Sequence, residues 1–467
     1  MIEITRRLAA RFRAMLRRSV VDRTPRGEWP LMACRTDAQG LHLYAQRDSV
    51  GLRFDVPGKR PPAVLAFRSS ELAQFEGRSD DCVVLEGIGP AKGRARWHEG
   101  PMPCGVEFET VAPESAAAAP QMPSRWVDQP ARFVSALDEA ARAAAKESIR
   151  FALSHLHWRG STGELIATDG RQLLVQSGFA FPWKNDVLLP AVRAFGLREL
   201  AAEGPVAVGR VGQRVFVRIG PWTFDLEVQE GRFPNVHQVV PRPETIMSRM
   251  KFDRDDVVFL LESLATAPGR ADEEFPVTLE FGSPPIFRAR GTDVNAAAEI
   301  EVSRSVCQGR PARVPIGGSY LSRALRLGCN ELAVSKPDAP LLFQGDGCTY
   351  VVMPLNPELA IAPAEGATHI ASAIDVADRL QPRTRRTPMP PSHANGHAGS
   401  NGTGAAADAE RGPGFQELLV EADQLRAQVQ DVLARLTKLL AGLKQFRRQG
   451  RAVQAAVQSI RDLRLEG

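Results

Sequence analysis

The chain has 467 residues, of which 43% are hydrophobic and 24% charged, as in an ordinary soluble globular protein, and its length suggests about three domains. No stretch approaches the roughly 18 apolar residues of a membrane span, and the Arg-rich N-terminus lacks the apolar core of a secretory signal. The six cysteines form no Cys-x-x-Cys pair, and six thiols in so long a chain do not make a disulfide framework, which favours a reducing, cytoplasmic location. The net charge of +5 mildly favours a polyanionic partner.

The first segment of the chain opens with an amphipathic helix, predicted at residues 4–18 from apolar residues at helical spacing. The apolar stripe of this helix consists of Ile4, Leu8, Phe12 and Leu16. The alternating pattern of residues 40–48 then predicts a half-buried strand, and residues 68–75 are predicted as a second helix. The stretch 113–124, rich in Ala and Pro, is expected to be a linker.

Two later segments repeat this order of elements. In the second segment, the helix, the strand and the second helix are predicted at residues 130–145, 163–169 and 189–200. In the third segment, they are predicted at residues 254–264, 285–291 and 318–327. The three strands lead to Asp48, Asp169 and Gly291, which are 121 and 122 residues apart. So constant a period indicates a tandem repeat of domains and not a solenoid of short units.

The character of the chain changes after Pro354. Residues 381–414 are rich in Pro, Gly, Ala and Ser and cannot bury a core, so we expect a disordered tether there. Residues 415–465 carry apolar residues at spacings that alternate between four and three, which is the pattern of a coiled coil. Gly442 and Gly450 interrupt this pattern, and a bend that gives a helical hairpin is an alternative to one straight helix.

Three motifs carry a resemblance to a known family. Residues 166–173 read Ile-Ala-Thr-Asp-Gly-Arg-Gln-Leu, residues 230–241 begin Glu-Gly-Arg-Phe-Pro-Asn, and residues 350–355 read Tyr-Val-Val-Met-Pro-Leu. Together, in this order and at these separations, they resemble the beta subunit of bacterial DNA polymerase III. That family reads Ala-Thr-Asp-Gly-His-Arg-Leu, then Glu-Gly-Arg-Phe-Pro-Asp-Tyr, then Tyr-Val-Val-Met-Pro-Met. The resemblance covers roughly residues 1–360 and is strongest in the second and third segments.

The resemblance implies an α+β fold of three tandem DNA-clamp domains, each with two helices against β-sheets. The implied clamp domains are residues 1–112, 125–244 and 245–360, followed by a flexible linker at 361–414 and a helical coiled coil at 415–467. Family members close head to tail as homodimer rings around double-stranded DNA. They serve DNA polymerase and the clamp loader without catalysis, so we expect no cofactor, no metal and no membrane partner. Topology, and not base-specific affinity, holds such a ring on DNA.

Basic residues on the predicted helices, and just beyond the end of the second segment's first helix, are candidates for contact with DNA phosphates. They are Arg6, Arg7, Arg11, Arg13, Arg17, Arg18, Arg142, Lys146, Arg150, Arg193, Arg198, Arg323 and Arg326. A solvated helix face is the alternative, but the first helix has six arginines with no acid between them, more than solubility requires. The third segment departs from this pattern with Asp253, Asp255, Asp256 and Glu262. We expect Asp253 and Asp255 to cap the helix start.

The resemblance also implies a partner-peptide cleft between the second and third domains, lined mostly by apolar residues that suit Leu and Phe anchors. The matching positions are Leu153, Thr168, Gly170, Arg171, Leu173, Pro234, Val239, Val351, Met353, Pro354 and Leu355. This chain departs from the family at Gln172, where an Arg is usual, and at His237 and Gln238, which replace a basic pair. Drift is one interpretation, and altered partner specificity or regulation by the tail is the other. Residues 416–420 weakly resemble a clamp-binding peptide, but we assign them to the first turn of the coiled coil.

The sequence shows no catalytic triad, paired acid motif or nucleotide fingerprint, and His155 and His157 lack nearby partners for a metal site. We therefore predict a ring-shaped DNA sliding clamp that tethers polymerase and repair proteins through the cleft. The alternative is a clamp-derived scaffold that uses the coiled coil for oligomerisation or partner docking. Ring closure, the loader, the polymerase and the pairing of the coiled coil are left open by the sequence.

Overall fold

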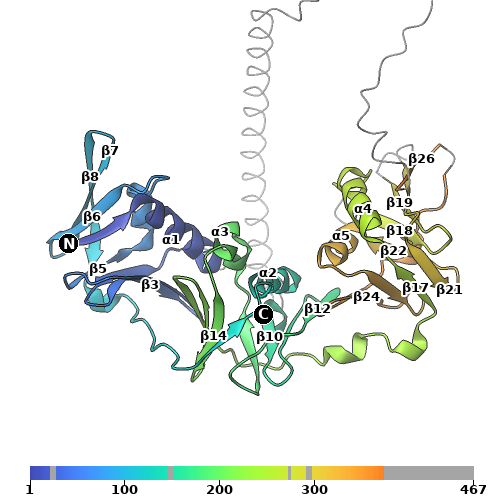
Figure 1. Ribbon diagram of the computed structural model, residues 1–467, viewed down its shortest axis with the longest axis horizontal. Helices are drawn as coiled ribbons and strands as arrows, with labels where there is room; N and C mark the ends of the chain where they lie inside the picture. The colour runs from blue at the N-terminus through green and yellow to red at the C-terminus, as the bar shows by residue number, and fades with distance from the viewer. Residues whose placement is uncertain (22–27, 146–150, 272–274, 291–296, 365, 373–467) are drawn as a thin grey trace, which may run out of the picture. The chain divides into compact units, whose positions relative to one another are not determined.

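A computed structural model of the chain describes residues 1–21, 28–145, 151–271, 275–290, 297–364 and 366–372 (Figure 1). The predicted coiled coil and residues 373–414 of the predicted linker lie outside the described residues. The α-helices of the described part are α1 (Arg6–Ser19), α2 (Phe133–Ala143), α3 (Arg198–Ala201), α4 (Arg254–Thr266) and α5 (Gly318–Arg326). Within the described residues, no helix combines the length and the apolar character that a membrane span needs.

The first predicted helix is present as α1, with a shifted start. The side chain of Thr5 accepts a hydrogen bond from the backbone N–H of Leu8 at 3.0 Å and caps the helix. Phe12 and Leu16 are fully buried, and Leu8 packs against the same core. Ile4 is buried too, but it lies in the strand β1 (Ile2–Thr5), so the helix begins two residues later than predicted.

The largest sheet joins two of the predicted domains. Its twelve strands run in the order β1-β6-β7-β8-β5-β2-β3-β4-β16-β15-β14-β9. The strands from the first segment are β1 (Ile2–Thr5), β2 (Leu31–Thr36), β3 (Gly40–Arg47), β4 (Val50–Pro57), β5 (Ala63–Arg68), β6 (Cys82–Gly89), β7 (Lys92–Glu99) and β8 (Met102–Val111). Those from the second segment are β9 (Trp126–Gln129), β14 (Val206–Val211), β15 (Arg214–Ile219) and β16 (Trp222–Glu227). The antiparallel pairing of β4 with β16 makes the join.

A nine-stranded sheet joins the second and third segments in the same way, through the pairing of β12 with β25. Its strands, in spatial order, are β13 (Asp186–Pro190), β10 (His155–Arg159), β11 (Glu164–Thr168), β12 (Gln172–Gln176), β25 (Cys348–Val352), β24 (Leu341–Gly345), β23 (Glu331–Val334), β17 (Ser248–Lys251) and β21 (Val306–Gly309). The predicted strands at 40–48 and 163–169 correspond to β3 and β11 and occupy equivalent places beside these two joins. The repeated plan therefore extends to how neighbouring segments are connected.

A five-stranded sheet completes the third segment. Its strands, in spatial order, are β22 (Arg313–Gly317), β18 (Pro276–Glu280), β19 (Ile286–Arg290), β20 (Ala297–Glu301) and β26 (Thr368–Ala371). The predicted strand at 285–291 is β19. β26 lies within residues 361–414, which were predicted as a flexible linker, so the start of that segment differs from the expectation and belongs to the sheet.

The second helices are less regular than predicted. Residues 68–75 form the 3-10 helix η2 (Ser69–Gln74), and residues 318–327 form α5. The predicted helix at 189–200 is divided into the end of β13, the 3-10 helix η5 (Arg193–Gly196) and the short α3. Pro190 explains part of this difference, because it pairs with His155 as the last residue of a strand. α1 contacts η2 and η5, and α2 contacts η5. α4 contacts α5, and the two helices lie side by side in Figure 1.

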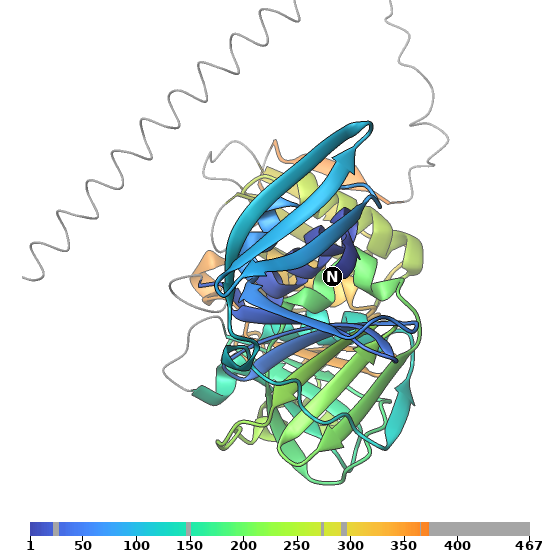
Figure 2. The ribbon, with the colours of Figure 1, turned by 90° about the vertical axis from the view of Figure 1, so that its left-hand side faces the viewer.

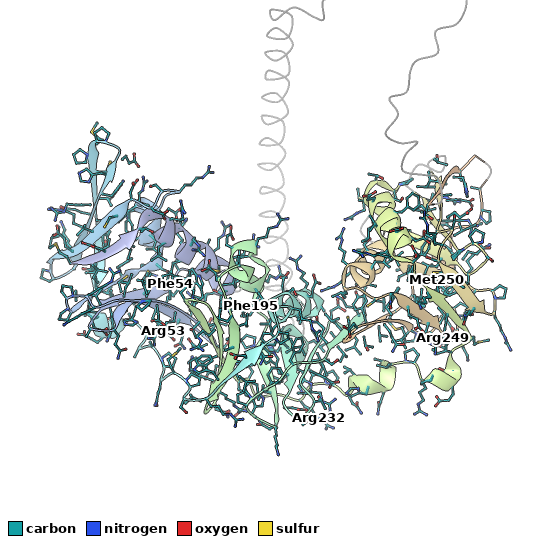
Figure 3. The ribbon with its side chains drawn as sticks, viewed as in Figure 1. Arg53, Phe54, Phe195, Arg232, Arg249 and Met250 are labelled. Carbon is teal, nitrogen blue, oxygen red and sulfur yellow. The ribbon has the colours of Figure 1, made fainter. Side chains whose placement is uncertain are left out.

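The join between β4 and β16 is densely packed. The ring of Phe54, labelled in Figure 3, lies 4.5 Å from the fully buried Trp222 across the two strands. Beside this pair, the carboxylate of Asp225 is buried and bonded to Arg214 and to the hydroxyl of Tyr44. The first and second segments are thus held together by apolar packing and by a buried polar cluster that crosses the sheet.

Candidate functional site

A groove of about 220 Å³ lies beside the join between β12 and β25. Its lining comes from the turn before β12, from β25 and the residue after it, and from the connecting segment at 234–239. The lining residues are Leu153, Thr168, Gly170, Arg171, Gln172, Leu173, Pro234, Asn235, Val236, Val239, Pro340, Val351 and Met353. A space of this size suits single side chains of a peptide better than a drug-sized ligand.

The floor of the groove is set by the turn between β11 and β12. The carboxylate of Asp169 accepts hydrogen bonds from the backbone N–H groups of Arg171 and Gln172, at 2.8 Å and 2.9 Å. Gly170 has a φ of 94°, a conformation that residues with a side chain rarely adopt. The backbone N–H of Met353 then bonds to the carbonyl of Arg171 at 2.9 Å. The Thr-Asp-Gly motif is therefore a turn that fixes the position of β12 against β25.

The opposite wall of the groove is the stretch at residues 234–239, which lies between the second and third segments of the chain. It covers a separate apolar cluster made of Ile166, Leu173, Val236, Ala333, Leu342 and Val351. Phe233 stacks on His157 at 4.8 Å, and His237 lies 3.0 Å from the guanidinium of Arg159. Burial lowers the pKa of His157 below its usual 6.5, so at neutral pH the ring is uncharged and suited to stacking. Arg232, labelled in Figure 3, is exposed on the same segment.

Gln172 connects the groove to the helices behind it. Its side-chain oxygen accepts hydrogen bonds from the hydroxyl of Tyr350 at 2.6 Å and from the guanidinium of Arg323 at 3.2 Å. Its amide nitrogen donates to Asp169 at 2.8 Å. The same guanidinium is paired with the carboxylate of Glu139 at 2.9 Å. This network joins α2, α5, β12 and β25, and it accounts for a glutamine where the family has arginine.

Replacing Gln172 with arginine, the residue usual in the family, is expected to lower the free energy of unfolding by about 1–3 kcal/mol. The change removes the acceptor of Tyr350 and places a second guanidinium beside Arg323. Chemical denaturation measures the effect, with Gln238→Arg, at an exposed position of the stretch 234–239 that does not line the groove, as the matched control. Equal stability of Gln172→Arg and the unchanged chain would contradict the explanation that this hydrogen-bond network requires glutamine at position 172.

All predicted cleft residues except Pro354 and Leu355 line this groove. Those two residues follow β25 and turn away, with the backbone N–H of Leu355 bonded to the carbonyl of Pro315. Sequence reasoning missed Asn235, Val236 and Pro340 as lining residues. Asn235 and Val236 lie between two predicted positions and could have been found from that alone. Pro340 lies just before β24, and only the pairing of β24 with β25 brings it to the groove.

The arginines of α1 are more neutralised than the sequence suggests. Acids from distant parts of the chain face four of them: Glu99 pairs with Arg6, Asp80 with Arg7, Glu203 with Arg11, and Glu76 with Arg13. The expectation that this helix is uncompensated is therefore wrong for those four positions. The helix itself contains no acid, but the fold brings carboxylates to it from β7, from the stretch after η2 and from the stretch after α3.

A basic pocket of about 650 Å³ remains at the end of α1. Its lining consists of Ala10, Arg13, Ala14, Arg17, Arg18, Trp29, Glu76, Arg193 and Leu197. Arg17, Arg18 and Arg193 are exposed, and Glu76 is the acid that lines the pocket. These guanidiniums line one pocket and come from both the first and the second segment.

The other basic candidates are scattered. Arg198 and Arg326 are exposed, while Arg142 pairs with Asp138 one helical turn away at 2.9 Å. The structure corrects the prediction that Arg323 contacts DNA phosphates. Its side chain is 15% exposed and is held by Glu139 and Gln172, so Arg323 has a structural role. The remaining two candidates, Lys146 and Arg150, lie outside the described residues.

The acids of α4 have local explanations. Asp253 caps the helix by accepting a hydrogen bond from the backbone N–H of Asp255 at 2.9 Å, as predicted. Asp256 is fully buried and accepts from the backbone N–H of Arg304 at 2.9 Å and from the hydroxyl of Ser305 at 2.7 Å. It therefore holds the turn after β20 and does not face solvent. Among the described residues, no group of acidic, His or Cys side chains could hold a metal ion.

No protein-family model matches this sequence, and no curated protein sequence matches it. Among solved structures, the DNA polymerase III subunit beta from Pseudomonas aeruginosa is similar, with a TM-score of 0.60 and 20% identity over 76% of this chain and 99% of that chain. The Helicobacter pylori beta clamp bound to a DNA ligase peptide has a TM-score of 0.60 and 14% identity over 76% and 99% of the two chains. The Borrelia burgdorferi subunit beta in complex with a natural product has a TM-score of 0.63 and 11% identity over 76% and 97%.

These likenesses, with few helices packed on large antiparallel sheets, define a clamp-like fold. The particular fold is that of the DNA polymerase III beta subunit, and the resemblance found in the sequence motifs is confirmed at the level of the fold.

Proposed function

We propose that this chain is a DNA sliding clamp, a non-catalytic processivity factor that encircles duplex DNA as a homodimer ring. The observation that carries the proposal is the apolar groove beside the β12–β25 join, within a clamp-like fold. Val239 and Met353 lie on opposite walls of this groove and are 49% and 45% exposed. Exposed apolar side chains around a small groove are suited to the apolar anchors of a peptide.

Partner binding at this groove is the part of the proposal that the geometry supports best. The lining residues Leu153, Leu173 and Val351 offer apolar surface, and the flexible Met353 adapts to different anchors. The Helicobacter pylori clamp of similar fold is bound to a DNA ligase peptide. We propose that the groove of this chain takes short peptides of DNA polymerase, clamp-loader or repair proteins with Leu and Phe anchors.

Contact with DNA is proposed for the exposed guanidiniums of the basic pocket. Arg17, Arg18 and Arg193 present positive charge from two segments of the chain, as sequence-independent phosphate contacts require. Arg6, Arg7 and Arg11 contribute less than expected from the sequence, because carboxylates already neutralise them. The proposed DNA face is therefore narrower than the full set of basic helices.

Retention on nicked circular DNA in the presence of a clamp loader tests the proposal. We expect the full-length chain to stay on the circles at a salt concentration that removes simple electrostatic binding, and to leave once the circles are linearised. A chain ending at Pro382 keeps β26 and removes the segment predicted as a coiled coil, so it shows whether the tail affects loading. Binding that ignores DNA topology, or no binding, would reject the clamp proposal.

A clamp-derived scaffold is the second candidate. The neutralised arginines of α1 favour it, because they reduce the positive charge available to DNA. In that case the heptad pattern of residues 415–465 would supply oligomerisation, and the groove would bind partners without a ring. The absence of topological retention, together with intact peptide binding, is the combined result that identifies the scaffold.

A further inference from the structure

The segment after the third clamp-like unit covers a sheet edge. Residues 368–371 form β26, which pairs in parallel with β20 in the register Ala298↔Thr368 to Glu301↔Ala371. The backbone N–H of Ser372 donates to the carbonyl of Glu301 at 3.0 Å, and its hydroxyl accepts from the backbone N–H of Ser303 at 2.9 Å. β20 pairs with β19 on its other side, so β26 occupies the outer edge of the five-stranded sheet.

This added strand is lightly held. Thr368 and His369 are exposed, and Ile370 is only partly buried against the core. His369 lies 3.4 Å from the carboxylate of Glu301 and is half exposed. Before the strand, the chain is anchored at Ile361, which is 6% exposed and whose backbone N–H bonds to Thr278 at 2.7 Å. β26 can therefore leave the sheet while the chain stays anchored at Ile361.

A second edge in the same chain is uncovered. β8 pairs with β7 along residues 102–109, but only Thr110 and Val111 pair with β5 on the other side. Among the described residues, no other strand pairs with residues 102–109, and Met102 is 65% exposed. The light-blue strands of this part of the chain lie at the top of the ribbon in Figure 2. An open strand edge of this length offers a row of backbone donors and acceptors to another strand, and proteins commonly cover or use such edges.

We propose that β26 is a displaceable cap on β20, and that the strand which displaces it is β8 of a second copy of this chain. The inference rests on the proposed ring, whose closure needs one edge from each end of the chain in a head-to-tail contact. The open part of β8 is longer than the four residues of β26, so it can form more ladder hydrogen bonds. In a dilute monomer the cap protects the edge, and closure of the ring releases the tail.

Charges on β20 favour the capped state. Glu299 and Glu301 lie on β20, where His369 of the cap approaches them at 4.0 Å and 3.4 Å. β8 carries Glu107 and Glu109, and on its neighbour β7 Arg94 is paired with Glu107 and Arg96 with Glu86. The incoming edge therefore brings no surplus of positive charge to replace His369. The choice of β8 as the occupant rests on its open backbone edge and on head-to-tail closure of the ring.

A disulfide lock tests the cap directly in the full-length chain. Ala298 and Thr368 are register partners, so the double variant Ala298→Cys with Thr368→Cys can be oxidised to fix β26 and reduced to release it. We expect the oxidised form to self-associate at least about tenfold more weakly than the reduced form in sedimentation velocity. The single variant Ala298→Cys controls for cross-links to the native cysteines. Equal self-association of the two redox states would overturn the proposal.

A release variant tests the opposite direction. Ile370→Asp places a carboxylate where a partly buried apolar side chain lies in register with the buried Ile300, so the cap should leave and self-association should strengthen. Ala362→Asp, at an exposed position outside β26, is the matched control. In hydrogen exchange, the amides of residues 368–372 should exchange faster at protein concentrations that favour the dimer. Protection that does not change with concentration would also overturn the cap.

The same variants separate this inference from the proposed function. If all of them are retained on nicked circles equally well, the clamp proposal stands and the cap is rejected. If none is retained and none self-associates, the ring fails and the cap fails with it. Retention that is lost on oxidation and restored on reduction supports both.

Discussion

Replacing Asp225 with alanine is expected to lower the free energy of unfolding by about 3 kcal/mol, the lower end of the range for breaking a buried ion pair. Asp225 is 2% exposed and accepts from Arg214 and from the hydroxyl of Tyr44. Alanine would leave both partners without this acceptor at the join between β4 and β16. We expect a loss of unfolding free energy at the lower end of the range, because the side chain of Arg214 is 23% exposed and its guanidinium can be partly hydrated once Asp225 is removed.

Chemical denaturation of Asp225→Ala measures this loss, with Glu227→Ala as the matched control. Glu227 is 46% exposed and lies 3.8 Å from the same guanidinium, so its removal should cost less than about 1 kcal/mol. Burial raises the pKa of Asp225 above its usual 3.8 despite the neighbouring Arg214, which shows how strongly the site is removed from water. An equal, small effect of the two substitutions would contradict a buried polar cluster at the join.

The joins between segments could not be predicted from the sequence. The local sequence pattern located β3, β11 and β19, but their burial does not alternate as a half-buried strand requires, since residues 165–168 of β11 and 287–289 of β19 are buried in succession. The partner of a strand is not local: β4 pairs with β16, far along the chain, and no pattern in either strand specifies that choice. The sheets therefore continue from one predicted domain to the next through the pairings β4–β16 and β12–β25, which lie away from the predicted boundaries in the sequence.

Compensation of charge was missed for the same reason. The six arginines of α1 were judged by their sequence neighbours, whereas their acids come from residues such as Glu76 and Glu203, which only the fold brings close. The groove was better predicted, because most of its lining lies in two contiguous motifs, at 168–173 and 234–239. Motif matches identify lining residues that are close together in the sequence. They do not identify Pro340, which reaches the groove only because β24 pairs with β25.

The groove and the β12–β25 join are one structural feature. Leu173 and Val351 are register partners in the join, and both line the groove. Gln172, which is also in the lining, ties this ladder to α5 through Arg323. A peptide in the groove would therefore contact the residues that connect the second and third segments. Its binding should be sensitive to the integrity of that connection as well as to the exposed anchors.

Placing aspartate at both Val239 and Met353 is expected to weaken peptide binding by about 100-fold or more. Each side chain offers apolar surface to an anchor, and burial of one such side chain contributes about 1.5–3 kcal/mol, where 1.4 kcal/mol is a factor of ten in affinity. Because both are nearly half exposed in the free chain, stability should change by less than about 0.5 kcal/mol for each substitution. Fluorescence anisotropy with a short labelled peptide that carries Leu and Phe anchors measures the affinity.

Val211→Asp is the control for that double variant, because Val211 is an exposed valine on β14 that does not line the groove. It should bind the peptide as the unchanged chain does. Unchanged affinity in the double variant would move the peptide site away from this groove. Loss of affinity in the Val211→Asp control as well would show a general effect of added negative charge. Loss confined to the double variant places the anchors between the two walls, since Val239 and Met353 approach the groove from different segments of the chain.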